Sequence, residues 1–231
     1  MPLDIPIVYT DNRILLCLKP PGVVSVDQPG GLPQRLRAQL GGEGVCLRTV
    51  HRLDQPVGGL MVLARSRQAA KLLSQQMEER THFHKAYLAV VRGKPADREG
   101  TLRDLLGYDR TTRQAYVAQE PGREVRPAVL HYRVAAHQGE YTLLAITLET
   151  GRTHQIRVQL ASRGLPLVGD CKYGAPPADM EGIALWSYRL SFLHPQSGEG
   201  VAFSALPPAV WPWSVFDLRG MEDAREEGGG G

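Results

Sequence analysis

Short apolar runs separated by turn residues dominate this sequence, and they constrain its fold more than any other feature. Their Val, Ile, Leu and Tyr content is typical of strands. We expect two short strands within residues 5–26 and further strands at residues 60–64, 85–93, 129–135, 141–148, 184–192 and 201–205. Helices are expected at residues 33–40, 66–80 and 153–164, with Ser66 and Thr153 as caps of the second and third. Because the strands do not alternate strictly with helices, we predict an α+β fold with a mixed, mostly antiparallel central sheet flanked by helices.

The strand pattern begins near Ile5 and continues without an internal repeat or a break in composition. A chain of 231 residues, 42% of them hydrophobic and 22% charged, can bury one sizeable core. We therefore predict a single domain over residues 1–218, with no separate N-terminal binding domain. Residues 222–231 are acidic and then all glycine, and we predict a disordered tail over residues 219–231.

The cysteine spacing and the hydropathy of the chain indicate its cellular compartment. Cys17, Cys46 and Cys171 are widely spaced without a C-x-x-C pair, which argues against a zinc knuckle or a disulfide framework. No basic leader precedes an apolar segment, and no apolar run approaches the ~18 residues of a membrane span. We predict a cytoplasmic protein that is not bound to a membrane.

The charge balance fits a polyanionic partner without proving one. The formal net charge is +3, which is also common among unrelated proteins. Only five of the 27 basic residues are lysines, so arginine predominates. Its planar guanidinium suits bidentate phosphate contacts and stacking on bases, although a coding bias would give the same composition.

The segment from His51 to Asp54 reads H-R-L-D, which alone is a weak signal because an Asp beside an Arg is usually a surface ion pair. A protein-kinase loop is excluded, since the chain has neither a Gly-rich phosphate loop nor D-F-G. His82 and His84 could chelate a metal, but no third ligand follows them. With no dinucleotide fingerprint or P-loop either, we predict no metal and no cofactor.

Five segments in order raise the significance of H-R-L-D. They lie at residues 12–24 (NRILLCLKPPGVV), 51–59 (HRLDQPVGG), 85–93 (KAYLAVVRG), 150–160 (TGRTHQIRVQL) and 166–174 (PLVGDCKYG). Together they resemble the RluA-type pseudouridine synthases, which isomerise uridine in RNA. In that family H-R-L-D usually continues into Thr-Ser-Gly two residues later, whereas this chain has Val57, Gly58 and Gly59 there.

The resemblance implies that Asp54 is the catalytic carboxylate. It would act either as a nucleophile on ribose C1′ or as a base at C2′, and the sequence does not choose between these. The implied reaction is a redox-neutral isomerisation, for which a missing cofactor motif is expected. Arg157 would form the ion pair that holds Asp54 ionised and oriented, gripping it through paired hydrogen bonds. Arg152 is the competing partner and could instead bind phosphate at the start of the helix.

Further roles follow from the same resemblance. Tyr87 would stack on the target base and pass a proton late in the reaction, and Lys85, on the same strand face, could touch the RNA backbone. The uridine must be flipped out of its stack, and Arg52 is the natural residue to fill the gap. His51 and His154 are expected to brace loops by hydrogen bonds.

The predicted partner is RNA, either ribosomal or transfer RNA, and the predicted state is a monomer. Without an N-terminal RNA-binding domain, the catalytic domain itself would choose the uridine. Two other functions fit the same residues: a catalytically silent RNA-binding or ribosome-assembly protein, and a nucleosidase that releases free uracil.

Overall fold

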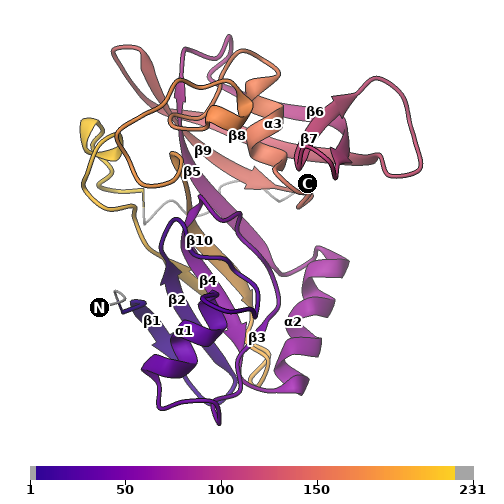
Figure 1. The fold of residues 1–231 in the computed structure, drawn as a ribbon, viewed down its shortest axis with the longest axis vertical. Coiled ribbons are helices and arrows are strands. Elements are labelled where there is room, and N and C mark those ends of the chain that lie inside the picture. Colours follow the sequence, from indigo (N-terminus) through magenta and orange to yellow (C-terminus); the bar gives the residue numbers. More distant parts are fainter. Residues whose placement is uncertain (1–3, 222–231) are drawn as a thin grey trace.

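A computed structural model describes residues 4–221 of the chain, and one sheet of 11 strands runs through the whole of it (Figure 1). The strand order is β1-β2-β4-β10-β5-β9-β8-β6-β7, with β11 paired to β10 and β3 paired to β4. The strands are β1 (Ile7–Thr10), β2 (Ile14–Lys19), β3 (Arg48–Thr49), β4 (Gly58–Ala64), β5 (His84–Arg92), β6 (Glu99–Asp109), β7 (Gln114–Ala118), β8 (Arg126–Gln138), β9 (Tyr141–Leu148), β10 (Leu185–Leu193) and β11 (Gly200–Ser204).

Within residues 4–221 the pair β4 and β10 is parallel, whereas every other strand pair is antiparallel. The predicted α+β class, with a mixed and mostly antiparallel sheet, is confirmed. Strands β3, β6 and β7 were not expected, because charged residues and glycines interrupt their apolar pattern. The predicted tail begins at residue 219, and its residues 222–231 lie outside the described part of the chain.

Three helices cover the two faces of the sheet. Helices α1 (Leu32–Gln39) and α3 (Gln155–Ala161) contribute Leu36 and Ile156 to the main core on one face. Helix α2 (Arg67–Glu79) packs Ala69 and Leu73 against the opposite face of β2 and β4. Figure 1 shows α1 and α2 beside one half of the sheet and α3 beside β6, β7 and β8 in the other half.

The start of α3 differs from the prediction. Ser66 caps α2 as expected, since its Oγ accepts a hydrogen bond from the Ala69 N–H. Thr153, however, is not the cap of α3. The residue in the cap position is His154, whose backbone is left-handed (φ 55°) and whose side chain makes no cap hydrogen bond. The helix stops at Ala161, so it has only 7 residues.

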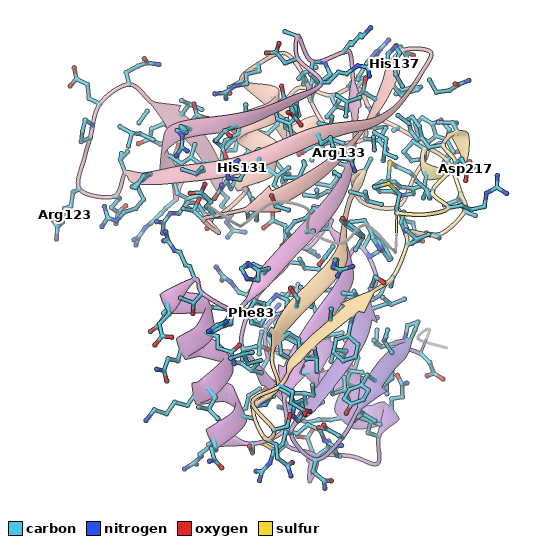
Figure 2. All side chains as sticks on the ribbon, turned by 180° about the vertical axis from the view of Figure 1, so that it is seen from behind. Phe83, Arg123, His131, Arg133, His137 and Asp217 are labelled. Atoms are coloured by element: carbon cyan, nitrogen blue, oxygen red, sulfur yellow. The ribbon has the colours of Figure 1, made fainter. Side chains whose placement is uncertain are left out.

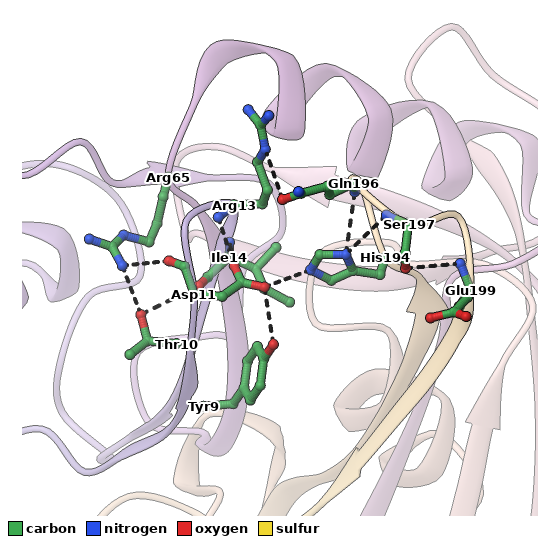
Figure 3. Close-up of polar contacts among 10 residues, drawn as sticks. All are labelled: Tyr9, Thr10, Asp11, Arg13, Ile14, Arg65, His194, Gln196, Ser197 and Glu199. Carbon is green, nitrogen blue, oxygen red and sulfur yellow. Dashed lines mark hydrogen bonds and ion pairs between the residues drawn. The ribbon is translucent and has the colours of Figure 1, made fainter.

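The turn between β1 and β2 is fastened to the turn between β10 and β11 (Figure 3). Asp11 accepts hydrogen bonds from His194 Nε2 (2.8 Å), from the Tyr9 hydroxyl (3.0 Å) and from the N–H groups of Arg13 and Ile14. Although burial of the carboxyl opposes it, these donors lower the pKa of Asp11. This network fixes the end of the sheet that lies farthest from α3.

The reverse face of the sheet carries an open groove of about 1620 Å³. Figure 2 shows its labelled side chains, with Phe83 near α2 and with His131 and Arg133 on β8. His131 bridges Thr101 and Glu149, at 2.8 Å and 2.6 Å. Among the described residues, no helix has the length and apolarity to span a membrane, and no group of three His, Cys, Asp or Glu side chains could hold a metal ion.

Candidate active site

Asp54 lies in the loop between β3 and β4, and this loop is clamped to the turn that follows β2. The Ser25 Oγ donates to the Leu53 carbonyl (2.6 Å) and accepts from the Leu53 N–H (3.1 Å). One residue beyond the aspartate, the Gln55 carbonyl accepts a hydrogen bond from the Gly22 N–H (2.8 Å). The backbone on both sides of Asp54 is therefore fixed before any ligand arrives.

Lys19 completes this clamp from inside the protein. Its side chain is fully buried, and Nζ donates to the carbonyls of Pro20 (3.0 Å), Val23 (2.8 Å) and Gln55 (3.2 Å). Burial lowers the pKa of Lys19 to about 8, while the nearby charge of Asp54 opposes that change. The sequence indicated no role for this lysine, since nothing in K-P-P-G showed that its ammonium would be enclosed by carbonyls.

Gly58 stands where the resembled family usually has serine, and the structure explains the replacement. A Cβ at this position would lie 2.5 Å from the ring of Trp186, its partner in the parallel pairing of β4 and β10. At Gly59 (φ 119°) a Cβ would lie 2.4 Å from the Ser187 carbonyl oxygen. Trp186 thus fills the space of the missing side chain, and the loop of Asp54 keeps its path.

Arg157 links Asp54 to a second, deeper carboxylate. Its Nη1 donates to Asp54 Oδ2 at 3.2 Å, whereas Nε and Nη2 donate to Asp170 at 2.7 and 2.8 Å. Asp170 and Arg157 are almost fully buried, while the Asp54 side chain is 26% exposed. Burial alone would lower the pKa of Arg157, but hydrogen bonds and charge from Asp170, with Asp54 contributing, raise it.

This geometry corrects one expectation. The paired hydrogen bonds of the Arg157 guanidinium hold Asp170, and Asp54 receives a single bond. Arg152 forms no hydrogen bond or ion pair with Asp54 among the described residues, and its Nε donates instead to the Pro127 carbonyl at 3.0 Å. Asp170 belongs to the segment at residues 166–174, which carried part of the resemblance but to which no role was given.

His154 and Tyr173 form the other wall beside Asp54. The Tyr173 hydroxyl lies 2.7 Å from His154 Nδ1 and accepts a hydrogen bond from the Ala115 N–H at 2.7 Å. His154 Nε2 lies 3.8 Å from Asp54 Oδ2. The Tyr173 ring also lies under the Arg157 guanidinium, 5.0 Å from its carbon, in a cation–π contact. Nothing in the sequence pointed to Tyr173, and His154 was expected only to brace a loop.

Tyr87 stands on β5 at the base of a pocket of about 80 Å³ in front of Asp54. Burial raises the pKa of the Tyr87 hydroxyl, and the charge of Asp54 raises it further. The six side chains that the sequence predicted for catalysis or RNA binding all border this one pocket, together with apolar groups. The lining residues are Arg52, Leu53, Asp54, Val57, Lys85, Tyr87, Leu148, Gly151, Arg152, His154, Gln155, Ile156, Arg157 and Leu185.

The mouth of the pocket is basic. Arg52 is exposed there, and the Lys85 ammonium, whose pKa burial lowers, borders both the pocket and the reverse groove. The pKa of Arg152 is lowered by burial and by the like charges of Arg80 and Arg126. Cations that lie this close together attract an anion such as phosphate, because its negative charge offsets the repulsion between them.

His51 connects the loop of Asp54 to strand β4, and a bracing role of this kind was expected for it. Its Nε2 accepts a hydrogen bond from the Val62 N–H at 3.1 Å, and its ring packs 5.6 Å from that of Phe83. Burial, together with the charge of Lys85, lowers the pKa of His51 to about 3, so the ring is neutral at physiological pH. It faces away from the pocket and takes no part in its lining.

Fold and site together define a pocket in which the Asp54 carboxylate is bound by a buried arginine and is bordered by basic side chains. Comparison with known proteins identifies the family. Residues 13–162 match the family model described as RNA pseudouridylate synthase. The uncharacterised RNA pseudouridine synthase YlyB of Bacillus subtilis is 37% identical over 228 residues, which cover 94% of this chain and 74% of that protein.

Two further relatives extend the comparison. The ribosomal large subunit pseudouridine synthase D of Neisseria meningitidis is 35% identical over 230 residues, covering 90% of this chain and 59% of the relative. The solved structure of human RNA pseudouridylate synthase domain containing 1 has a TM-score of 0.76 at 25% identity and covers 89% of this chain and 84% of its own. The chain therefore belongs to the RluA-type RNA pseudouridine synthase family, whose members are isomerases.

Proposed function

We propose that this protein isomerises a specific uridine in structured RNA to pseudouridine, with Asp54 as the catalytic carboxylate. The observation that carries the proposal is the position of Asp54 in the pocket: one oxygen is bound by Arg157 at 3.2 Å, and its side chain remains 26% exposed to a ligand. A carboxylate that is oriented and accessible can attack C1′ or take a proton from C2′.

Tyr87 and the apolar wall of the pocket suit an extruded uracil. An aromatic ring offers a stacking surface to any base, and Leu148, Ile156 and Leu185 provide an apolar surround. We propose that Tyr87 stacks on the flipped uracil and that Arg52, exposed at the mouth, occupies the space left in the RNA.

RNA beside the target would run along basic side chains. Lys85 borders both the pocket and the reverse groove, so a strand leaving the pocket meets a surface large enough for several nucleotides. We propose that Lys85 and Arg152 bind its phosphates, supported by the mutual repulsion of Arg152, Arg80 and Arg126, which an anion would relieve.

Ribosomal RNA of the large subunit is the first substrate to test, because relatives such as the Neisseria meningitidis protein carry that name. Transfer RNA is the second. We further propose that the protein acts in the cytoplasm as a monomer, and that residues 1–218 form one catalytic domain that contacts the RNA itself.

The decisive experiment incubates the purified protein and its Asp54→Asn variant with ribosomal and transfer RNA and maps pseudouridine by sequencing. The protein should form pseudouridine at one or few sites, in the presence of EDTA, and Asp54→Asn should form none while binding the RNA almost as well. Release of free uracil would instead identify a nucleosidase, and unchanged but bound RNA would identify a silent binding protein.

A further inference from the structure

The strands β6, β7 and β8 have a face that lies opposite α3 and outside the catalytic pocket. On β6, Asp104 accepts a hydrogen bond from Gln159 of α3 at 2.7 Å, and Leu106 packs in one cluster with Val158 of the same helix. Because side chains alternate along a strand, the residues between and beside these two face away from α3. They form a second surface, on the reverse side of the sheet.

The strand register gives the order of the side chains on this surface, which we call the reverse-face row. The row consists of five cross-strand pairs: Glu99 with Arg133, Thr101 with His131, Arg103 with Val129, Leu105 with Pro127, and Gly107 with Tyr116. Directly paired residues of antiparallel strands point to the same face. Since a strand rises about 3.3 Å per residue, the row is about 26 Å long.

Tyr116 ends the row with a flat aromatic surface. Its ring lies across Gly107, where a Cβ would overlap the ring, and the residue is 48% exposed. The glycine therefore allows the ring to lie on the strand with its outer face toward solvent. Such a ring can stack on an unpaired base of any type.

Two arginines in the row have no acidic partner. Arg103 and Arg133 are exposed, and neither forms an ion pair within the described part of the chain. The neighbouring carboxylate of Glu149 is already engaged by His131, at 2.6 Å. The two guanidinium groups are thus available for an anion that comes from outside the protein.

The row is continuous with the catalytic pocket. Its end at His131 and Arg133 forms one wall of the reverse groove of about 1620 Å³ (Figure 2). The same groove reaches Lys85 and Gly151, which also border the pocket in front of Asp54. A chain that leaves the pocket can therefore follow the groove to the row.

We propose that the reverse-face row binds a single-stranded segment of the RNA that flanks the target uridine. This inference rests on the proposed function and adds to it a part of the substrate that is held outside the pocket. Arg103 and Arg133 bind phosphates of the segment, and Tyr116 stacks on one of its bases. The segment is single-stranded, because bases in a duplex are stacked on one another and offer no free face to a ring.

The test measures binding of a fluorescein-labelled oligouridylate of about 12 nucleotides, a length within the range of single-strand binding sites. Tyr116→Ala should weaken binding at least about fivefold, whereas Tyr116→Phe keeps the ring and should bind as the wild type does. Arg103→Gln, alone or with Arg133→Gln, should lower the slope of log affinity against log salt by about 0.7 for each phosphate contact that is lost. Arg67→Gln, at the opposite end of α2 from the groove, is the matched control and should change nothing.

Photocrosslinking locates the bound RNA directly. The same oligonucleotide with 4-thiouridine should modify the tryptic peptide of residues 114–123, which contains Tyr116. Absence of binding by the wild type, or crosslinks confined to the segments around Asp54, overturns the proposal. Wild-type affinity of both Tyr116→Ala and Arg103→Gln also overturns it and leaves the row as a surface for a protein.

The same variants separate this inference from the proposed function. With saturating ribosomal RNA, Tyr116→Ala should form pseudouridine at the single-turnover rate of the wild type, because the row binds RNA away from the reacting bond. A slower chemical step at saturation would contradict a role in binding alone. Absence of pseudouridine with the wild type would refute the proposed function, whereas the oligonucleotide data would still decide whether the row binds RNA.

Discussion

Arg157 gives two parallel N–H groups to Asp170 and only one, at 3.2 Å, to Asp54. The buried Asp170 therefore fixes the plane of the guanidinium, and the guanidinium in turn fixes Asp54. We therefore expect Asp54 to serve the chemistry and Asp170 to serve stability, because the Asp54 side chain is 26% exposed and the Asp170 side chain only 1%.

We predict opposite effects for Asp54→Asn and Asp170→Asn. The first should abolish turnover and change the free energy of unfolding by no more than about 1 kcal/mol, since its ion pair is partly solvated. The second leaves a buried guanidinium without its partner charge and should destabilise the protein by about 3 kcal/mol or more. Urea denaturation and single-turnover rates measure both; equal stability losses would contradict this division.

Arg157→Lys keeps the charge but cannot make two parallel bonds to Asp170 and a third to Asp54. We expect a chemical step at least about tenfold slower, or ~1.4 kcal/mol of transition-state stabilisation, and also a lower urea midpoint. RNA affinity should be nearly unchanged. A variant with normal rate and normal midpoint would show that the shared geometry is unimportant.

Substituting Tyr87 by Phe and by Ala should separate the contribution of ring stacking from that of the hydroxyl. Tyr87→Phe should retain RNA affinity and slow turnover only if the hydroxyl takes part. Tyr87→Ala removes the stacking surface, worth about 1 to 3 kcal/mol per base, and should weaken binding of the extruded base tenfold to a hundredfold. Affinities and single-turnover rates decide; wild-type values for both variants would remove Tyr87 from the site.

Gly58→Ser should be destabilising by about 1 to 3 kcal/mol, because its Cβ would meet the Trp186 ring at 2.5 Å. In a Trp186→Leu background the same substitution should cost much less. A double-mutant cycle by urea denaturation measures the coupling, which we expect to be at least about 1 kcal/mol. Additive effects would mean that Trp186 does not compensate for the missing side chain.

His51 should make the protein sensitive to acid. Its pKa is about 3 in the folded protein and 6.5 ordinarily, so between these values the unfolded chain binds a proton that the folded protein does not. Stability from this group is complete above pH 6.5 and is lost as pH falls toward 3, by at most about 1.4 kcal/mol per pH unit. Chemical denaturation across this window should give a flatter profile for His51→Gln than for wild type or His137→Gln.

Arg152→Gln should weaken RNA binding in a salt-dependent way and leave the chemical step intact. Removing one phosphate contact should reduce the slope of log affinity against log salt by about 1. Titrations at several salt concentrations, with Arg110→Gln as a control in an exposed ion pair with Glu124, measure it. An unchanged slope would place Arg152 outside the RNA path.

Local sequence determined much of this protein. The local sequence patterns predicted most strands and the helices α1, α2 and α3, because side-chain periodicity indicates which face of an element is buried. Asp54, Tyr87 and Arg157 were found by their motifs, and the structure brings them to one pocket. Strands β6 and β7 were not predicted, because their apolar patterns are weak. Their hydrogen-bonded pairing with each other, and of β6 with β8, forms these strands in the folded protein.

Only the tertiary structure decided which groups meet. Asp170 and Asp54 are 116 residues apart and share one guanidinium, and Lys19 reaches the carbonyl of Gln55 across a turn that no spacing rule specifies. His154, left-handed in its backbone and packed edge-to-face on Tyr108 and Tyr173, occupies the cap position that was expected for Thr153. Such contacts depend on burial and on long-range pairing, which give a side chain its partners only after the chain has folded.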